Sequence, residues 1–296
     1  MKKTHVLEKL HLAFIGAGAM GEAMIGGLLS RHQLDPGHIT ASDKHRERLH
    51  EIRDAFHIHA ASDNRTAARK GQVVVLAVKP QVLPAVLADL RGQIRRDALV
   101  LSIVAGTTIE TIAAGLRHRA IVRTMPNTPV QVGEGMTVWT ATPEVSTAQL
   151  EQSRAIVSAL GHQLYVDDEH FLDMATAISG SGPSYVFLLM EALIDSAVHL
   201  GFSRTDAREL VIQTIRGSAH FAERSTVHPA EMRNMVTSPG GTSAEALYQL
   251  EKGAFRTIIS KAVLAAYQRS VALGQLGAAQ ADPPPTARKT RKRTRS

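Results

Sequence analysis

The chain has 296 residues, of which 44% are hydrophobic, and it contains no cysteine. This length suits one large domain or two ordinary ones, and the hydrophobic content excludes wholesale disorder. The absence of cysteine excludes disulfides, thiolate catalysis and cysteine metal sites. The formal net charge is +7, but residues 282–296 carry six basic side chains against Asp282, so the rest of the chain is close to neutral.

The start of the chain does not look like a signal peptide. The basic residues at 1–5 are followed by Glu8, Lys9 and His11, which interrupt any apolar segment. No uncharged apolar run is long enough to cross a bilayer, so we expect no membrane association. With the lack of cysteine, these features predict a cytoplasmic protein.

The first half of the chain alternates short apolar runs with helix-like segments. The run at 73–78 is apolar on both faces, as in a covered parallel strand. Alternating strands and helices predict right-handed βαβ units in a doubly wound α/β sheet. The strands predicted in this half are 10–15, 39–42, 73–78, 99–104 and 120–123.

A glycine-rich loop follows the first predicted strand and opens a helix. The segment 16–21 matches G-x-G-x-x-G in full. Gly16 permits the tight turn, Gly18 lets the backbone approach a pyrophosphate, and Gly21 lets helix and strand pack closely. Strand, loop and helix in this order predict a dinucleotide site. The residues expected to form it are Ile15, Gly16, Ala17, Gly18, Ala19, Met20 and Gly21.

Asp43 ends the second predicted strand, where an acid commonly binds the adenine ribose. A carboxylate there favours NAD and repels a 2′-phosphate. Lys44, Arg46 and Arg48 follow at once and are suited to attract that phosphate. Asp43 could equally be the N-cap of the next helix. The sequence therefore leaves NADH and NADPH both open.

Two further segments stand at strand ends. Residues 77–80, Ala77-Val78-Lys79-Pro80, end the strongest strand, which places Lys79 at the ligand crevice, although a lysine there is often only solvated. Residues 125–129 form a rigid turn between two prolines, which either shapes the crevice or merely reverses the chain.

The second half of the chain has a different character. From about residue 167 to 277 we find only helical patterns. The segment 184–200 is apolar nearly all round, so a partner subunit is expected to cover it. We therefore predict a dinucleotide-binding domain at 1–168, a helical substrate-binding and dimerisation domain at 169–277, and a disordered basic tail at 278–296. That tail lacks aromatic residues for base stacking, so nucleic acid is not an expected partner.

A second glycine turn, at 236–243, precedes an apolar helical stretch in this half. Its Pro239-Gly240-Gly241 sequence leads into Thr242 and Ser243. Free backbone N–H groups at such a helix start bind a carboxylate or phosphate, although a simple cap has the same pattern. The fourteen histidines form no H-E-x-x-H motif, so no metal is expected.

Taken together, five segments resemble the pyrroline-5-carboxylate reductase family and occur in its order. They cover about residues 10 to 275, and the last two are highly specific. The segments are 15–20, 77–81, 126–129, 179–185 and 236–243.

The resemblance implies a Rossmann-like N-terminal domain and an all-helical C-terminal domain that forms a homodimer, often assembled further into a decamer. It implies NADPH or NADH as cofactor, pyrroline-5-carboxylate as substrate and proline as product. By position, the residues it places on the cofactor are Ala19, Met20, Asn64, Ala77 and Lys79, with Val104 and Ala105 near the nicotinamide. The residues it places on the substrate are Glu169, Thr242 and Ser243.

The mechanism expected from these residues needs little side-chain chemistry. The amides of Gly241, Thr242 and Ser243 would bind the substrate carboxylate, and the Ser243 hydroxyl would contact the ring nitrogen. Ser243 stands where the family usually has threonine. Other interpretations stay open: a reductase of another cyclic imine or of a β-hydroxy acid, or a nucleotide-sensing protein whose basic tail binds nucleic acid.

Overall fold

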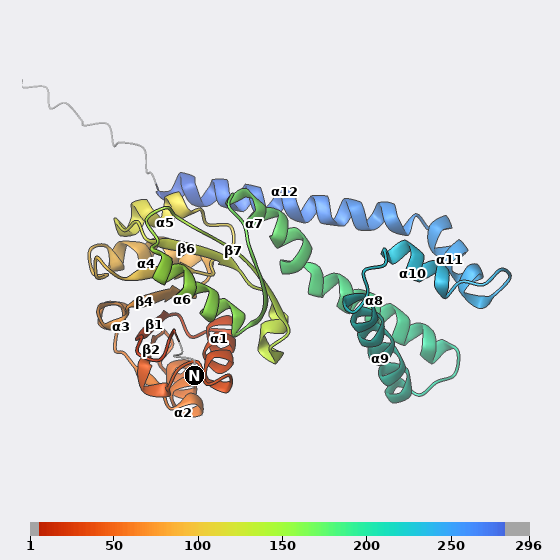
Figure 1. Ribbon diagram of the computed structural model, residues 1–296, viewed down its shortest axis with the longest axis horizontal. Helices are drawn as coiled ribbons and strands as arrows, with labels where there is room; N and C mark the ends of the chain where they lie inside the picture. The colour runs from red at the N-terminus through yellow and green to blue at the C-terminus, as the bar shows by residue number, and fades with distance from the viewer. Residues whose placement is uncertain (1–5, 282–296) are drawn as a thin grey trace, which may run out of the picture. The chain divides into compact units, whose positions relative to one another are not determined.

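A computed structural model describes residues 6–281, with side chains described as far as residue 275 (Figure 1). This range divides into two compact units. Unit 1 comprises residues 6–176 and 268–281, and unit 2 comprises residues 177–267. Unit 2 is thus inserted between two segments of unit 1. The tail expected to be disordered at 278–296 lies outside the described residues from 282 onward.

Unit 1 is built on an eight-stranded sheet in the order β3-β2-β1-β4-β5-β6-β7-β8. All neighbours are parallel except the β6–β7 pair, which is antiparallel. The strand order reverses between β1 and β4, and ligands of doubly wound sheets bind at this point. The strands are β1 (Leu12–Ile15), β2 (Ile39–Ser42), β3 (His59–Ala60), β4 (Val73–Leu76), β5 (Leu99–Ser102), β6 (Ile121–Met125), β7 (Gly135–Ala141) and β8 (Gly161–Tyr165).

Helices cover both faces of this sheet, so the central strands are apolar on both sides. Leu12 and Phe14 of β1 belong to one core, whereas Ala13 and Ile15 belong to the other. The first core is closed by α1 (Ala19–Ser30), α2 (Arg46–Phe56) and α6 (Thr147–Ser158). The second is closed by α3 (Asn64–Lys70), α4 (Leu83–Leu90) and α5 (Ile109–Leu116). The predicted doubly wound α/β domain is confirmed.

Three strands were not predicted from the sequence. The apolar residues of β7 are interrupted by Gly135, Thr137 and Thr140, β8 is largely exposed, and β3 has only two residues. β7 and β8 extend the sheet beyond β6. The turn at 125–129 leads through the 3-10 helix η3 (Thr128–Val132) into antiparallel β7, and the Asn127 side chain accepts a hydrogen bond from the Met136 N–H at 2.8 Å. This turn therefore reverses the chain.

Helix α7 (His170–Ala175) packs on the last strands of the sheet through the buried Leu172. A π-helical turn, Thr176–Gly180, follows it as the chain leaves unit 1. The chain re-enters unit 1 within α12 (Phe255–Ala281).

Unit 2 is all-helical. Its helices are α8 (Gly182–His199), α9 (Arg204–Glu223), α10 (Pro229–Met235), α11 (Thr242–Lys252) and the first part of α12. α8 has no buried residue in the single chain, and Phe187 and Leu188 are 59% and 67% exposed. The run 170–199 is apolar and long enough to cross a membrane, although length and composition alone are weak evidence. This exposed apolar surface agrees with the expectation that another subunit covers α8.

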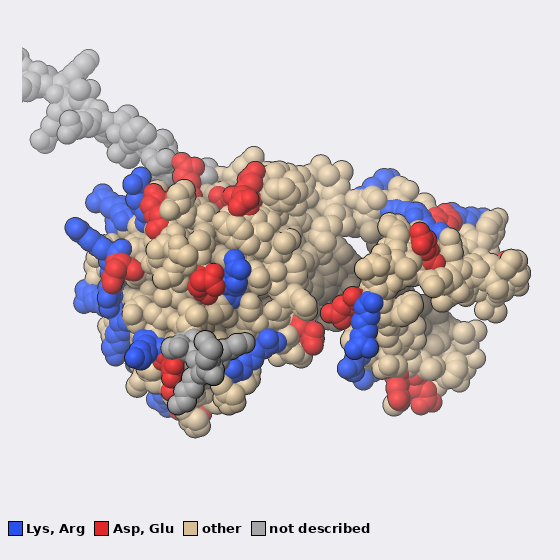
Figure 2. Space-filling view, viewed as in Figure 1, with Lys and Arg blue, Asp and Glu red and all other residues tan. Residues whose placement is uncertain are grey.

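Charged side chains of both signs intermix over the visible face of unit 1 (Figure 2). Among the charged residues of unit 1, Arg65 pairs with Asp89 and Arg95 pairs with Asp97, both at 2.7 Å. Such mixing agrees with the small net charge of the chain before residue 282.

Candidate functional site

The three glycines of the loop after β1 each meet a different constraint. Gly16 has φ of +101°, and a Cβ there would lie 2.5 Å from the Ala77 carbonyl oxygen. A Cβ on Gly21 would lie 2.8 Å from the Gly16 carbonyl oxygen. Gly18, in contrast, has no heavy atom within 4 Å of a Cβ placed on it, so the space beside it at the start of α1 is open to a ligand. The loop fits a dinucleotide pyrophosphate.

Asp43 fixes this loop from the end of β2. Its Oδ2 accepts a hydrogen bond from the Ala17 N–H at 2.8 Å, and its Oδ1 accepts one from the His45 N–H at 2.9 Å. The N-cap of α2 is His45, so the alternative interpretation of Asp43 as that cap is wrong. The carboxylate is instead a fixed negative charge beside the predicted ribose position.

Arg48, suggested by the sequence as a phosphate ligand, is already hydrogen-bonded and ion-paired within the protein. It donates to the Ala17 carbonyl at 3.2 Å and pairs with Glu22 and Glu51. Hydrogen bonding to Glu51, reinforced by Glu22, raises the pKa of the Arg48 guanidinium. Lys44 and Arg46 lie exposed beside it. Arg48 thus supports the loop, which the sequence did not predict.

Asn64 lies at the first position of α3, beside the end of β2. The Ser42 hydroxyl donates to its Oδ1 at 2.9 Å, which links the two predicted adenosine-side elements. Ser42 itself is buried and was not predicted as a site residue. A small hydroxyl residue at a strand end is too common a signal to single out.

The end of β4 adjoins the glycine loop across the reversal point of the sheet. The Ala77 N–H donates to the Ile15 carbonyl at 2.9 Å, and Val78 lies within 2.9 Å of a Cβ placed on Gly16. Lys79 and Pro80 follow at the surface, and Pro80 is exposed. These residues therefore lie together with the loop at the carboxyl edge of the sheet.

Val104 and Ala105 follow the next strand, β5. Val104 is buried, and its N–H donates to the Ser102 hydroxyl at 3.3 Å. Because the adenosine-side residues belong to β2 and α3, the other half of a dinucleotide would extend toward β4 and β5. The structure thus places every predicted cofactor residue along one edge of the sheet.

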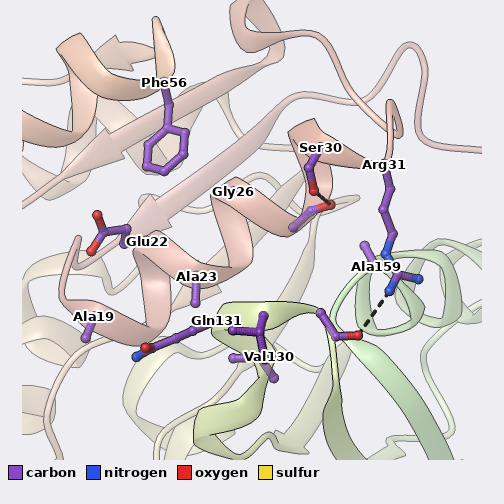
Figure 3. A pocket seen from close by; sticks show the side chains of 13 residues that line it. Ala19, Glu22, Ala23, Gly26, Ser30, Arg31, Phe56, Val130, Gln131 and Ala159 are labelled. Atoms are coloured by element: carbon purple, nitrogen blue, oxygen red, sulfur yellow. Dashed lines mark hydrogen bonds between the residues drawn. The ribbon is translucent and has the colours of Figure 1, made fainter. Parts of the chain in front are cut away.

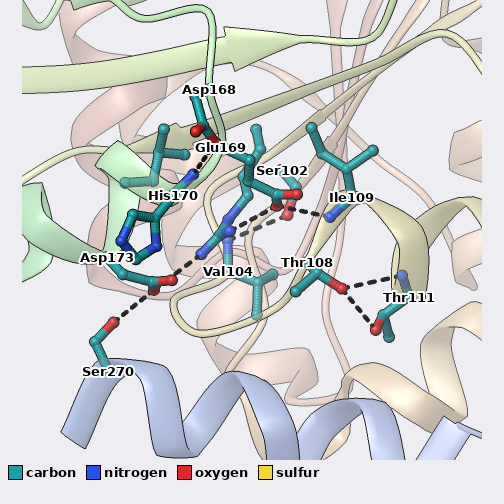
Figure 4. Close-up of polar contacts among 12 residues, drawn as sticks. Ser102, Val104, Thr108, Ile109, Thr111, Asp168, Glu169, His170, Asp173 and Ser270 are labelled. Atoms are coloured by element: carbon teal, nitrogen blue, oxygen red, sulfur yellow. Dashed lines mark hydrogen bonds and ion pairs between the residues drawn. The ribbon is translucent and has the colours of Figure 1, made fainter. Parts of the chain in front are cut away.

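Glu169 lies in unit 1, just before α7, in a polar network drawn in Figure 4. Its Oε1 accepts from the buried Arg123 Nη1 at 2.6 Å and from the Ile109 N–H at 2.8 Å. Asp173 lies 3.6 Å from Arg123 and accepts from the Ser270 hydroxyl at 2.8 Å. The one signal for this network in the sequence is a lone arginine in an apolar strand.

A hollow of about 730 Å³ runs along α1, between Phe56 and η3 (Figure 3). Its charged groups are already paired. Arg31 donates to the carbonyls of Ser158 and Gly133, both at 3.1 Å, and Glu22 pairs with Arg48. The hollow therefore offers no free charge to a ligand.

The predicted substrate turn belongs to unit 2. Gly240 has φ of +68°, and a Cβ on Gly241 would lie 2.5 Å from the Ser238 hydroxyl oxygen. Gly241 is the N-cap of α11, so the amides of Thr242 and Ser243 occupy the first helical positions, where no intrahelical acceptor exists. The positive end of the helix dipole and these N–H groups suit a carboxylate.

The reversal of strand order, the glycine loop and the acid that follows β2 define a dinucleotide-binding domain of the kind that oxidoreductases use. Two family models agree with this class. Residues 11–106 match "NADP oxidoreductase coenzyme F420-dependent", and residues 169–273 match "Pyrroline-5-carboxylate reductase dimerisation".

Comparison with known proteins identifies the family within this class of dinucleotide-binding proteins. The chain is 42% identical over 266 residues to the pyrroline-5-carboxylate reductase of Synechocystis, covering 90% of this chain and 99% of that protein. It is 35% identical to the Escherichia coli enzyme of that name, covering 89% and 98%. The Plasmodium falciparum pyrroline carboxylate reductase, solved with NADP bound, superposes with a TM-score of 0.83 at 32% identity, covering 90% and 99%. The chain belongs to the pyrroline-5-carboxylate reductase family.

Proposed function

We propose that this protein reduces 1-pyrroline-5-carboxylate to L-proline with NADPH or NADH, the last step of proline biosynthesis. One observation carries the proposal. The chain spans nearly the whole length of curated enzymes of that name, and it keeps both the glycine loop and the Gly240-Gly241 turn. The bound dinucleotide would supply a hydride at its nicotinamide.

The residues of unit 1 would hold the cofactor. Gly18 and the first amides of α1 receive the pyrophosphate, and Asp43 and Asn64 lie on the adenosine side. Ala77, Val78, Lys79 and Pro80, with Val104 and Ala105, line the edge toward the nicotinamide. These assignments combine the family resemblance with the open space beside Gly18.

The turn of unit 2 would hold the substrate. The amides of Thr242 and Ser243 bind its carboxylate, assisted by the dipole of α11. The Gly241 N–H, which was expected from the sequence to join them, instead donates to the Ser238 carbonyl at 3.0 Å. The Ser243 hydroxyl hydrogen-bonds the ring nitrogen and orients the face of the C=N bond. A protonated imine is already electrophilic, so the protein chiefly orients it and excludes water. The assignment of Glu169 to the substrate is supported only by the family resemblance and stays a prediction.

We place the functional boundary at residue 168, with 1–168 for the cofactor and 169–277 for substrate binding and self-association. A second copy covers the apolar surface of α8. We further propose a cytoplasmic protein free of membrane and nucleic acid, with dimers that assemble into a decamer. Light scattering of the purified protein tests the assembly.

The decisive experiment follows loss of dihydronicotinamide absorbance with NADH and NADPH at equal concentration. Oxidation is expected only after pyrroline-5-carboxylate is added, with proline as the product. No turnover with either cofactor would overturn the proposal. A panel of other cyclic imines and β-hydroxy acids tests the nearest alternative, another reductase with the same fold.

A further inference from the structure

Arg123 is a buried charge for which the proposed function names no role. It lies on β6, directly beside Ser102 of β5 in the register of the sheet, and its side chain is 4% exposed. A buried guanidinium is stable only when it is paired and hydrogen-bonded. Here Glu169 and Asp173 provide the pairing, so the cluster joins β6 to the segment that begins α7.

The cluster contacts the C-terminal end of the loop that follows β5, residues 103–108. Oε1 of Glu169 accepts the hydrogen bond from Arg123 and also the one from the Ile109 N–H, the first amide of α5. The near end of the loop is held by the Ser102 hydroxyl, which accepts from the Val104 N–H. Arg123 therefore orients the carboxylate that fixes where this loop ends.

A second branch of the cluster supports the middle of the same loop. Asp173 accepts from the buried Ser270 hydroxyl, which places the end segment of α12 on unit 1. One turn further along α12, a Cβ on Gly106 would lie 3.0 Å from the Leu273 Cβ, and one on Gly274 would lie 3.4 Å from the Gly106 carbonyl oxygen. Helix α12 thus packs directly against the tip of the loop.

The loop at 103–108 lies where the reacting end of the cofactor is expected, so the cluster that holds this loop bears on the reaction. The glycine loop and Asp43 lie on the β1–β2 side of the reversal point, so the adenosine half binds there. The loop after β5 lies on the opposite side, toward which the reacting end of a dinucleotide extends. A small error in placing the reacting atoms can cost about a hundredfold in rate.

We infer that Arg123 is a positioning residue for the nicotinamide end of the cofactor site. It acts through Glu169 and through Asp173 with Ser270, which together hold the loop 103–108. The inference rests on the proposed function for its kinetic consequence. Its consequence for cofactor binding is independent of the substrate.

The test uses Arg123→Lys in the full chain, with Arg119→Lys as the matched control. Lysine keeps the buried positive charge but cannot bridge two carboxylates with a planar fork. Arg119 stands just before the same strand, and its pair with Glu144 is exposed. We expect Arg123→Lys to lower kcat by about tenfold to a hundredfold and to weaken NADH binding. The control should behave as the parent.

Affinity for ADP-ribose, which lacks the nicotinamide, separates positioning from general damage. Fluorescence titration with NADH and calorimetry with ADP-ribose give the two dissociation constants. Only NADH should weaken, while ADP-ribose stays within about twofold of the parent. Equal losses for both ligands, or unchanged NADH binding and kcat in the folded variant, would overturn the inference.

Ser270→Ala is the second variant, should Arg123→Lys fail to fold. It deletes one hydrogen bond and leaves both charges of the Arg123–Glu169 pair in place. The same selective loss of NADH affinity is expected, at several-fold. A folded Ser270→Ala protein with unchanged NADH affinity and kcat would then overturn the inference. Absence of pyrroline-5-carboxylate turnover in the parent would instead count against the proposed function, since both binding arms need no substrate.

Discussion

The carboxylate of Asp43 accepts a hydrogen bond from the backbone N–H of Ala17, in the middle of the glycine loop, at 2.8 Å. The side chain thus holds the glycine loop, and under the proposed function it would also carry a negative charge toward the adenine ribose. Removing Asp43 is therefore expected to change both the loop and the cofactor preference.

Asp43→Ser is expected to shift the ratio of kcat/KM values toward NADPH by about tenfold, because the negative charge no longer repels a 2′-phosphate. Loss of the bond to Ala17 should raise KM for both cofactors. Initial rates with NADH and NADPH measure the ratio. Asp54→Ser, a surface carboxylate on α2, is the control. A ratio unchanged from the parent would contradict the role given to Asp43.

Alanine at Gly18 and at Gly16 should give opposite phenotypes. Gly18 faces open space, so Gly18→Ala should keep the parent's melting temperature while weakening NADH binding at least about tenfold. Gly16→Ala forces a positive φ and a contact with the Ala77 carbonyl, so it should cost about 1–3 kcal/mol of stability. Thermal unfolding and fluorescence titration separate the two. Similar melting temperatures for both variants would refute the distinction.

Ser243→Ala tests the proposed contact with the ring nitrogen. Removing one well-placed polar group should lower kcat/KM for pyrroline-5-carboxylate by about tenfold to a few hundredfold. Ser243→Thr, which keeps the hydroxyl, should retain most of the activity. NADH affinity should be unaffected in both variants, because Ser243 belongs to unit 2. Full activity of the alanine variant would remove Ser243 from the mechanism.

Leu188→Asp should disrupt self-association. Leu188 is 67% exposed in the single chain, and burying a leucine side chain stabilises an interface by about 1.5–3 kcal/mol, counted twice in a symmetric dimer. Sedimentation at several concentrations should show a smaller species. Val132→Asp, at a 75% exposed valine of unit 1, is the control and should keep the parent's mass. An unchanged mass for Leu188→Asp would place the interface elsewhere.

His11 should make stability fall in mild acid. Burial, with a smaller effect from His59, His38 and Lys70, lowers the pKa of His11 below its usual 6.5, and its ring lies 2.8 Å from the Thr40 hydroxyl. The unfolded chain then binds the proton more readily. The stability contribution is therefore complete above pH 6.5 and is lost as pH falls toward the lowered pKa.

His11→Gln should flatten the decrease of melting temperature between about pH 7 and pH 5.5. His162→Gln, which removes an exposed histidine of β8, is the control with the same number of histidines. Identical pH profiles for the parent and His11→Gln would show that His11 does not govern the acid sensitivity.

Local patterns explain why the cofactor loop was predictable. Gly16, Gly18 and Gly21 lie within six residues, and the structure shows why Gly16 and Gly21 must lack a Cβ, whereas the pyrophosphate contact of Gly18 stays a prediction. The apolar run at β4 was equally plain, although the strand ends at Leu76 and not at residue 78. β7 and β8 were missed because strands that are half polar carry a weak signal.

The Arg123 network could not be predicted because its partners are distant in sequence. Arg123 and Glu169 are 46 residues apart, and Ser270 lies 97 residues beyond Asp173. No local period relates such positions. Only the assembled sheet, with α7 and α12 packed on it, brings them within hydrogen-bonding distance.

The insertion of unit 2 also has a consequence for biosynthesis of the polypeptide. Helix α12 supplies Ser270, Leu273 and Gly274 to unit 1, but these residues leave the ribosome about a hundred residues after Ala175. A nascent chain that has just completed the sheet still lacks the helix that supports the loop after β5. The loop after β5 therefore gains its full support only after α12 has been synthesised, and dinucleotide capture by stalled nascent chains should appear only once α12 has emerged.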